Sequence, residues 1–297
     1  MATATEQFPP KTPPAPRAIS WAAIGWFGAL LIAAYYPILA RLVHQWSYDD
    51  DFSHGFFVPP VALFIAWQRR EEILKIPFKP AWWGLAVLVW AVVQAYVGWL
   101  SAELFLQRTA FIISLTGMLL VMGGTALVRI LVFPLLLLFF MVPIPALIFN
   151  YITFPLQIFA SQMAEFCLDL LGIPVFREGN ILELASQKLS VAEACSGIRS
   201  LLTLTFLSLV YSYFFDNKVW MRWFLLFATI PIAILANSGR VTITGILSET
   251  NPELAEGFFH SLEGLVISGI AICMMIVVHK MVNWLRGARQ LEAPGDV

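Results

Sequence analysis

Charged residues are scarce in this sequence. Only 12% of the 297 residues are Asp, Glu, Lys or Arg, and the formal net charge is −1. A charge this small and balanced offers no basic surface for nucleic acid, so we predict no nucleic-acid partner. Cysteine is also rare: Cys167, Cys195 and Cys273 make an odd number, and no CxxC spacing occurs. The sequence therefore predicts neither a disulfide framework nor a structural zinc site.

Apolar sequence dominates instead. Hydrophobic residues make up 59% of the chain, and the mean hydropathy is +0.78. Repeated apolar runs approach the roughly 20 residues that a helix needs to cross a bilayer, and charges are confined between them. We therefore predict an all-α integral membrane protein with about eight transmembrane helices. The predicted spans are residues 21–39, 52–67, 82–99, 104–122, 130–149, 198–215, 223–236 and 262–284.

The basic residues indicate how these spans are oriented. An even number of spans puts both termini on one side of the membrane. If that side is the cytoplasm, 12 of the 18 Lys and Arg residues fall in inner segments, the excess that cytoplasmic loops usually carry. We therefore predict a disordered cytoplasmic tail over residues 1–20, one polytopic membrane domain over residues 21–285, and a cytoplasmic C-terminal tail over residues 286–297.

The pattern changes between the fifth and sixth predicted spans. Residues 151–171 place apolar side chains at helical spacing and interrupt them with polar ones, which is typical of an amphipathic helix at a membrane interface. Gly172-Ile-Pro174 ends this helix. Residues 175–193 then alternate in polarity. This alternation predicts a small β-hairpin on the extracytoplasmic side, leading directly to Cys195.

Three reactive side chains from separate segments lie near the predicted outer surface. Cys195 precedes the sixth span, where the positive end of the helix dipole favours a thiolate, although a Cys at a helix junction is more often a packing residue. Arg240 lies near the outer end of the seventh helix, and His260 lies at the start of the eighth. Ionisable residues in apolar segments are costly and usually face the protein interior or a watery cavity. These three are our candidate catalytic residues.

Five further polar residues are candidates for supporting or substrate-binding roles. Asn237 lies three residues before Arg240 on the same helical face, from which it could hold the guanidinium. Asp51 and His54 lie at the outer face, where a proton-relay or metal role stays open. A lone His at a span boundary is more often an interfacial anchor, which is our interpretation of His44, His54 and His279. The local set of carboxylates with a single His is a weak metal signal, so we predict no metal and no cofactor. The supporting candidates are Glu193, Arg199, Asn237, His54 and Asp51.

The motifs around these residues resemble the exosortase/archaeosortase family. The similarity runs from about residue 51 to residue 284. The Cys, Arg and His motifs together in this order are specific, whereas each motif alone is weak. The principal motifs are Glu193-Ala-Cys195-Ser-Gly-Ile-Arg199-Ser, Ala236-Asn237-Ser-Gly-Arg240 and Phe258-Phe-His260. Ser53-His54-Gly55, Met141-Val-Pro-Ile-Pro145 and Gly172-Ile-Pro-Val-Phe-Arg-Glu-Gly179 accompany them.

This resemblance implies a membrane-embedded cysteine protease or transpeptidase, a bacterial exosortase of the PEP-CTERM sorting system. It implies the bacterial inner membrane, with the active site facing the periplasm, and a link to exopolysaccharide production. The implied substrates are exported envelope proteins with a C-terminal Pro-Glu-Pro motif, a hydrophobic span and a basic tail. Cys195 would then be the nucleophile, His260 the proton acceptor and donor, and Arg240 the group that stabilises the oxyanion or orients substrate. Arg199 could bind the Glu of the motif.

A transporter or flippase for envelope polysaccharide precursors is the alternative function. Asp51, Arg240 and His260 would then line a polar pathway, and the proline-broken spans would supply mobility. Against this alternative, the polar groups gather at one membrane face rather than the midplane, and the two halves show no internal repeat. A non-catalytic scaffold for polysaccharide assembly leaves the polar cluster unexplained. The sequence does not determine the oligomeric state.

Overall fold

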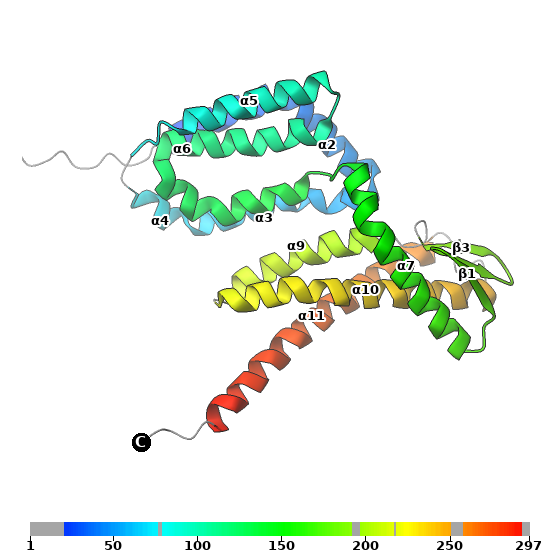
Figure 1. The fold of residues 1–297 in the computed structure, drawn as a ribbon. Helices are drawn as coiled ribbons and strands as arrows, with labels where there is room; N and C mark the ends of the chain where they lie inside the picture. The colour runs from blue at the N-terminus through cyan, green and yellow to red at the C-terminus, as the bar shows by residue number, and fades with distance from the viewer. Residues whose placement is uncertain (1–20, 77–78, 192–196, 217, 251–257, 293–297) are drawn as a thin grey trace, which may run out of the picture. The chain divides into compact units, whose positions relative to one another are not determined.

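The structure is a computed structural model that describes residues 21–76, 79–191, 197–216, 218–250 and 258–292. These residues are mostly helical and include a small antiparallel sheet (Figure 1). Three of their helical segments are long and apolar enough to cross a membrane, or four if the bent pair at the start of the chain counts as one span. The count of eight spans remains a prediction. The three segments are Leu104–Met141, Val219–Thr250 and Gly269–Arg286.

The chain divides into two compact units, Met1–His44 with Phe56–Val142 and Gln45–Gly55 with Pro143–Val297. In the first unit α5 packs along α6, and Gln94 of α5 donates hydrogen bonds to Thr109 Oγ1 (2.8 Å) and the Leu106 carbonyl (3.0 Å) of α6. Polar residues thus join two otherwise apolar helices. The helices of this unit are α1 (Trp21–Ala34), most of α2 (Tyr36–Tyr48), α3 (Val58–Gln68), α4 (Arg70–Leu74), α5 (Gly84–Leu100) and α6 (Leu104–Leu137), followed by the 3-10 helix η2 (Leu138–Met141).

Helix α6 is interrupted at Gly124, between the fourth and fifth predicted spans. Gly124 has φ 72° and ψ −167°, which are not helical values, and the helix turns back on itself there (Figure 1). A Cβ at this position would lie 2.1 Å from the carbonyl oxygen of Lys79. Only glycine tolerates both the positive φ and this close approach.

Two predicted boundaries in the first half of the chain are wrong. Helix α1 ends at Ala34, and α2 continues at an angle of 75° as far as Tyr48, where the sequence predicted a loop from about residue 41. Pro37 lacks an amide hydrogen, so it starts a new helix more easily than it continues the old one. The second predicted span begins at Val58 rather than residue 52, and α3 then has 11 residues. Such a helix is about 16 Å long, too short to cross a bilayer by itself.

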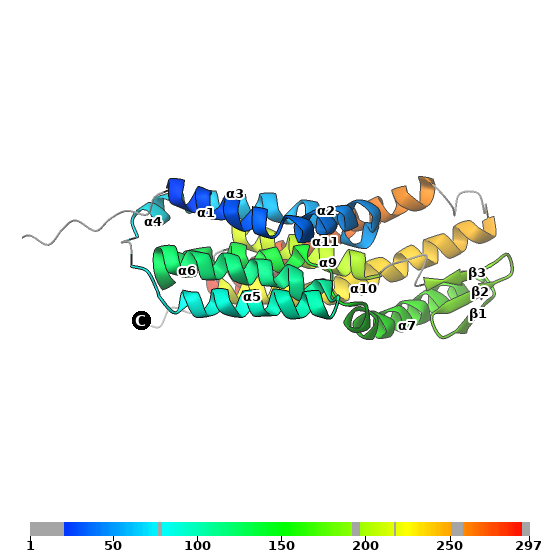
Figure 2. The ribbon, with the colours of Figure 1, turned by 90° about the horizontal axis from the view of Figure 1, so that it is seen from above.

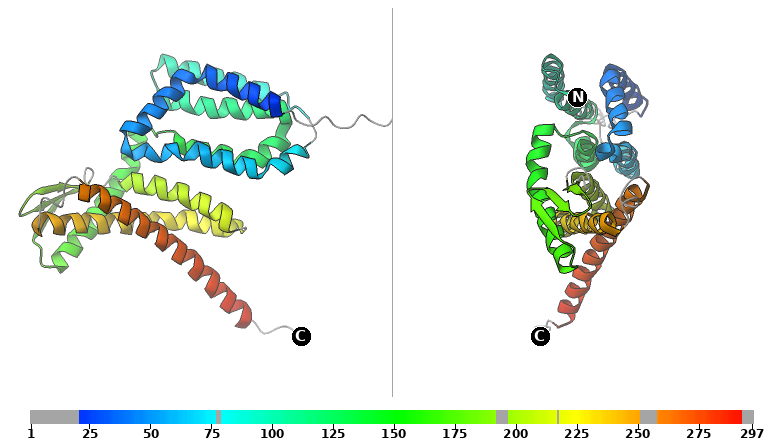
Figure 3. Two further views of the ribbon diagram at one scale, coloured as in Figure 1. Left: turned by 180° about the vertical axis from the view of Figure 1, so that it is seen from behind. Right: turned by 90° about the vertical axis from the view of Figure 1, so that its right-hand side faces the viewer.

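The second unit contains the 3-10 helix η1 (Asp50–Phe56, up to Gly55), three strands and four long helices among its described residues. Helices α9 and α10 form an antiparallel pair, and α11 crosses them (Figures 1 and 3). Buried apolar residues of α9, α10 and α11, including Leu204, Leu225 and Met275, form a common core. The elements are α7 (Ala146–Leu170), β1 (Val175–Glu178), β2 (Ile181–Leu184), β3 (Lys188–Ser190), α9 (Gly197–Phe215), α10 (Val219–Thr250) and α11 (Phe258–Glu292).

Helix boundaries here also differ from prediction. The fifth predicted span was expected to run to residue 149, but helical structure ends at Met141 and resumes at Ala146 with α7. Pro143 and Pro145 lie in the break, where each removes a backbone donor that a helix would need. Helix α10 runs unbroken to Thr250, so the loop expected from residue 248 is helical over its first residues.

Strands β1, β2 and β3 form a three-stranded antiparallel sheet in that order, where the sequence predicts a small β-hairpin. The sheet lies beside α7 (Figure 2). The β1–β2 turn is tied to α7, because Ser161 Oγ donates to the Gly179 carbonyl (3.0 Å) and Asn180 Nδ2 donates to Gln157 Oε1 (3.0 Å). An ion pair between Arg177 and Glu165 (2.6 Å) adds a further link. Helix α7 therefore holds the sheet in place.

Candidate functional site

Arg240 lies inside the second unit, on the C-terminal half of α10. Its side chain is 9% exposed, and that of Asn237 is 6% exposed. The neighbouring hydroxyls bond back to their own helix: Thr242 Oγ1 donates to the Ser238 carbonyl (2.9 Å), and Thr244 Oγ1 donates to the Arg240 carbonyl (3.0 Å). A supporting role for Asn237 remains a prediction. Arg240 is thus a buried cation on a helix whose neighbouring hydroxyls bond back to the helix itself.

The chain that leads to Cys195 is anchored beside Arg240. Val191, four residues before Cys195, and Val241, next to Arg240, belong to one buried apolar cluster with Leu168 of α7 and Leu189 of β3. Burial of this cluster removes apolar surface from solvent and so stabilises the chain up to Val191. Cys195 and Glu193 themselves lie outside the described residues.

A second anchor attaches the loop between β2 and β3 to the end of α10. The backbone amide and the hydroxyl of Ser186 both donate to Glu249 Oε1, at 2.9 and 2.8 Å. Gln187 Nε2 donates to Ser248 Oγ at 2.6 Å. The sheet is thus joined to α10 on one side and to α7 on the other.

Chain topology brings the start of α9, the later part of α10 and the start of α11 to one end of the second unit. Helix α9 begins two residues after Cys195, Arg240 is ten residues from the end of α10, and His260 is the third residue of α11. Because α9 and α10 are antiparallel, the start of α9 lies alongside the later part of α10, where α11 also begins (Figures 1 and 3). The backbone around Arg199 and His260 is helical; their side chains are outside what the structure describes.

Asp51 and His54 lie in η1, within the same compact unit. His54 is buried, and Phe52 beside it packs against Phe149 of α7, with ring centroids 6.0 Å apart. The burial of His54 does not fit the interpretation of this residue as an interfacial anchor. Asp51 is half-buried.

Among the described residues, no group of three or more His, Cys, Asp or Glu side chains could hold a metal ion. Cys167 is half-buried and Cys273 is exposed, and both are free thiols. Neither lies in the motifs around Arg240 or His260.

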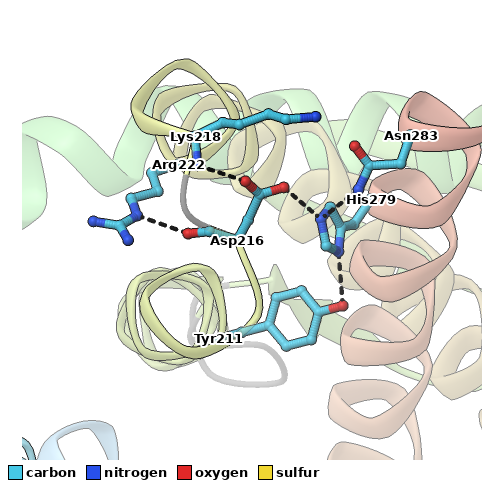
Figure 4. Close-up of polar contacts among 6 residues, drawn as sticks. All are labelled: Tyr211, Asp216, Lys218, Arg222, His279 and Asn283. Carbon is cyan, nitrogen blue, oxygen red and sulfur yellow. Dashed lines mark hydrogen bonds and ion pairs between the residues drawn. The ribbon is translucent and has the colours of Figure 1, made fainter. Parts of the chain in front are cut away.

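A second polar cluster, which the sequence motifs did not predict, lies at the α9–α10 turn (Figure 4). His279 of α11, interpreted above as an interfacial anchor, is instead buried and bonded at both ring nitrogens. Its Nε2 lies 3.0 Å from Asp216 Oδ2, and its Nδ1 lies 2.8 Å from the hydroxyl of Tyr211. Asn283 Nδ2 is 2.9 Å from His279 Nε2. The available signal was an acidic residue, Asp216, at the turn between the sixth and seventh spans, together with a His inside the eighth span.

Asp216 is held as a carboxylate. Its Oδ1 accepts a hydrogen bond from the Lys218 amide (2.7 Å), and its carbonyl accepts one from Arg222 Nε (3.0 Å). Burial alone would raise the pKa of Asp216, but the hydrogen bonds from Lys218, His279 and Asn283 lower that pKa on balance. The cluster therefore joins α9, the α9–α10 turn and α11 through a charged acceptor.

The fold and the site together define a multi-pass helical membrane protein with buried polar groups at both ends of one helical unit. The chain matches the family model described as transmembrane exosortase over residues 46–277. Because this match covers most of the chain, the protein belongs to the transmembrane exosortase family. No curated protein and no solved structure matches the chain significantly.

Proposed function

We propose that this chain is a membrane-embedded cysteine peptidase or transpeptidase that processes the C-terminal sorting signal of exported envelope proteins. The observation that carries this proposal is the burial of Arg240 on α10, beside the apolar cluster that anchors the approach to Cys195. Ionisable residues within membrane helices are costly, and they commonly mark functional sites. Membership of the exosortase family supports the same chemistry.

The proposed first step is acyl transfer to sulfur. The Cys195 thiol gives its proton to the imidazole of His260, and its sulfur forms a bond to the scissile carbonyl carbon. Arg240 stabilises the oxyanion that develops on the carbonyl oxygen. The C–N bond then breaks as His260 returns the proton to the leaving amine, and a thioester remains on Cys195.

The second step releases the acyl group. Water attack on the thioester gives a cleaved protein, whereas attack by an amine transfers the protein to a new acceptor. The proposal includes substrates with a Pro-Glu-Pro motif, a hydrophobic span and a basic tail, and Arg199 as a partner for the motif's Glu. It also places the site at the periplasmic face of the bacterial inner membrane, in a cell that makes exopolysaccharide. In that arrangement α7 and the sheet would cover the site and guide the substrate.

Replacement of Cys195 is the direct test. A tagged exported protein with the tripartite C-terminal signal is expressed with wild-type protein or with Cys195→Ala. We expect full-length precursor to accumulate with the variant, which should still insert and fold. Cys167→Ala and Cys273→Ala are matched controls, and both should process the precursor normally. Normal maturation with Cys195→Ala would exclude Cys195 as the nucleophile and would favour the transporter or flippase alternative.

Substitutions of Arg240 and His260 test their roles separately. Loss of one oxyanion donor typically costs about 100- to 1000-fold in kcat, so Arg240→Gln should slow processing by that factor. Arg240→Lys keeps the charge but not the fork of donors, so it should recover activity only in part. His260→Ala should abolish processing while the protein still inserts. Unchanged kinetics in either substituted protein would refute the role given to that residue.

A further inference from the structure

Helix α11 packs against the α9–α10 pair through a stripe of buried residues that partly buried apolar residues flank. Its buried residues in the described part, Ala271, Met275 and His279, recur every four positions. Ala271 and Met275 belong to the apolar core with α9 and α10. Apolar contacts are non-directional. A helix that crosses its neighbours on such a stripe can tilt or slide unless a directional contact holds it.

His279 supplies that directional contact. Its two ring nitrogens reach two different partners, Tyr211 near the end of α9 and Asp216 directly after α9 (Figure 4). Asn283, one turn later on α11, lies against the same imidazole. The rings of Tyr211 and His279 are also perpendicular, with centroids 5.3 Å apart. Hydrogen bonds to a charged acceptor are stronger than neutral ones, so this cluster fixes both the rotation and the axial position of α11 against α9.

Two candidate catalytic positions are near the other ends of the same two helices: α9 begins two residues after Cys195, and His260 is the third residue of α11. Position 260 precedes Ala271 by 11 residues, which is close to three helical turns, so both positions lie on the same side of α11. The distance along the helix axis from position 271 to position 260 is about 16 Å. A tilt of α11 by about 4° at the Ala271 contact would therefore move position 260 by about 1 Å. A misplacement of this size can cost about 100-fold in rate.

We propose that His279, held by Asp216 and Tyr211, is a positioning residue that sets the place of His260 relative to Cys195 and Arg240. The proposal rests on the peptidase function proposed above. It assigns no chemistry to His279, which acts only by fixing where the start of α11 lies. The fold thus uses a polar contact at one end of the unit to align reacting groups at the other.

Kinetics of substituted proteins test the consequence. His279→Phe keeps a planar ring but no hydrogen bond, and it should lower kcat for precursor processing about 10- to 100-fold with little change in KM, because substrate contacts remain. His279→Gln can still donate and accept, so it should recover part of the activity. Lys280→Ala, an exposed neighbour on the same helix, is the matched control and should behave as wild type. Unchanged kcat in His279→Phe would overturn the proposal.

A distance measurement tests the geometry without any activity. Spin labels are placed at two exposed positions, Ile243 of α10 and Val266 of α11, in a cysteine-free background. His279→Phe should shift or broaden the distance distribution, and Lys280→Ala should leave it as in wild type. An unchanged distribution in folded, membrane-inserted His279→Phe would overturn the positioning role even if its activity were lost. If the distribution shifts while Cys195→Ala still processes precursor, the peptidase function fails and the positioning proposal falls with it, although the helix contact itself stands.

Discussion

The close approach of α7 to α10 at Gly245 gives a prediction with a magnitude. A Cβ at this position would lie 3.1 Å from Leu168 Cδ1 and 3.3 Å from Cδ2, and Leu168 is fully buried. Overpacking of a filled core costs about 1–3 kcal/mol. Alanine also favours a helix over glycine by about 1 kcal/mol, so Gly245→Ala should range from neutral to about 2 kcal/mol destabilised.

A neighbouring glycine isolates the packing contribution. Gly239 is in the same helix, and a Cβ there meets nothing within 4 Å. Gly239→Ala should therefore show only the gain in helix propensity, about 1 kcal/mol. The difference in unfolding free energy between the two alanine variants, about 1–3 kcal/mol, measures the crowding against Leu168.

The partner substitution closes a double-mutant cycle. Leu168→Ala alone should cost about 2–5 kcal/mol because it opens a cavity. In the double variant the methyl group added at position 245 occupies part of the vacated space, so the combined loss should fall short of the sum by at least about 0.5 kcal/mol. Unfolding of the purified proteins in detergent mixed with increasing SDS gives these free energies. Additive losses, or equal stability of the two single glycine-to-alanine variants, would refute the packing of α7 on α10.

Three further predictions follow from local contacts. Gly55→Ala should displace the buried Trp46, because the new Cβ would overlap its ring. A changed Trp fluorescence spectrum and a lower melting temperature would report this displacement, and an unaltered spectrum and melting temperature would count against the contact. Asp216→Asn should lose the stability that comes from a carboxylate with a lowered pKa. That stability is fully present above the unfolded-state pKa of 3.8 and is lost as the pH falls through the lower folded-state pKa. The difference in melting temperature between wild type and variant should therefore be constant near neutral pH and narrow in acid, and a difference that widens in acid would contradict the prediction. Glu249→Gln weakens the two hydrogen bonds from Ser186, so limited proteolysis should cut the β2–β3 loop faster than in wild type, and equal cleavage rates would show that this anchor is dispensable.

Local sequence patterns predicted the membrane class, the family and most helix positions. Long apolar runs have few stable solutions in a bilayer, because every backbone polar group must be bonded internally. The strands after α7 were also visible as alternation of polarity over residues 175–193. Patterns of this kind need no knowledge of distant neighbours.

The boundaries at prolines were less predictable. Residues 143–145 were predicted to belong to an apolar span. Pro143 and Pro145 each lack the backbone N–H that a helix needs as a hydrogen-bond donor, so the helix ends and a new one, α7, begins at Ala146. The bend before Pro37 has the same cause. Hydropathy measures how apolar a segment is and does not register the loss of a donor.

What the sequence by itself determined was a set of candidate residues, including Arg240 and His260, since their types and spacing are properties of the chain. Only the tertiary structure decided that Arg240 is buried and that its neighbour Val241 shares a cluster with Val191. It also decided that His279 is bonded to Asp216, 63 residues away along the chain. Contacts between residues so distant depend on how helices cross, and helix crossing is set by side-chain packing over whole faces rather than by any local pattern.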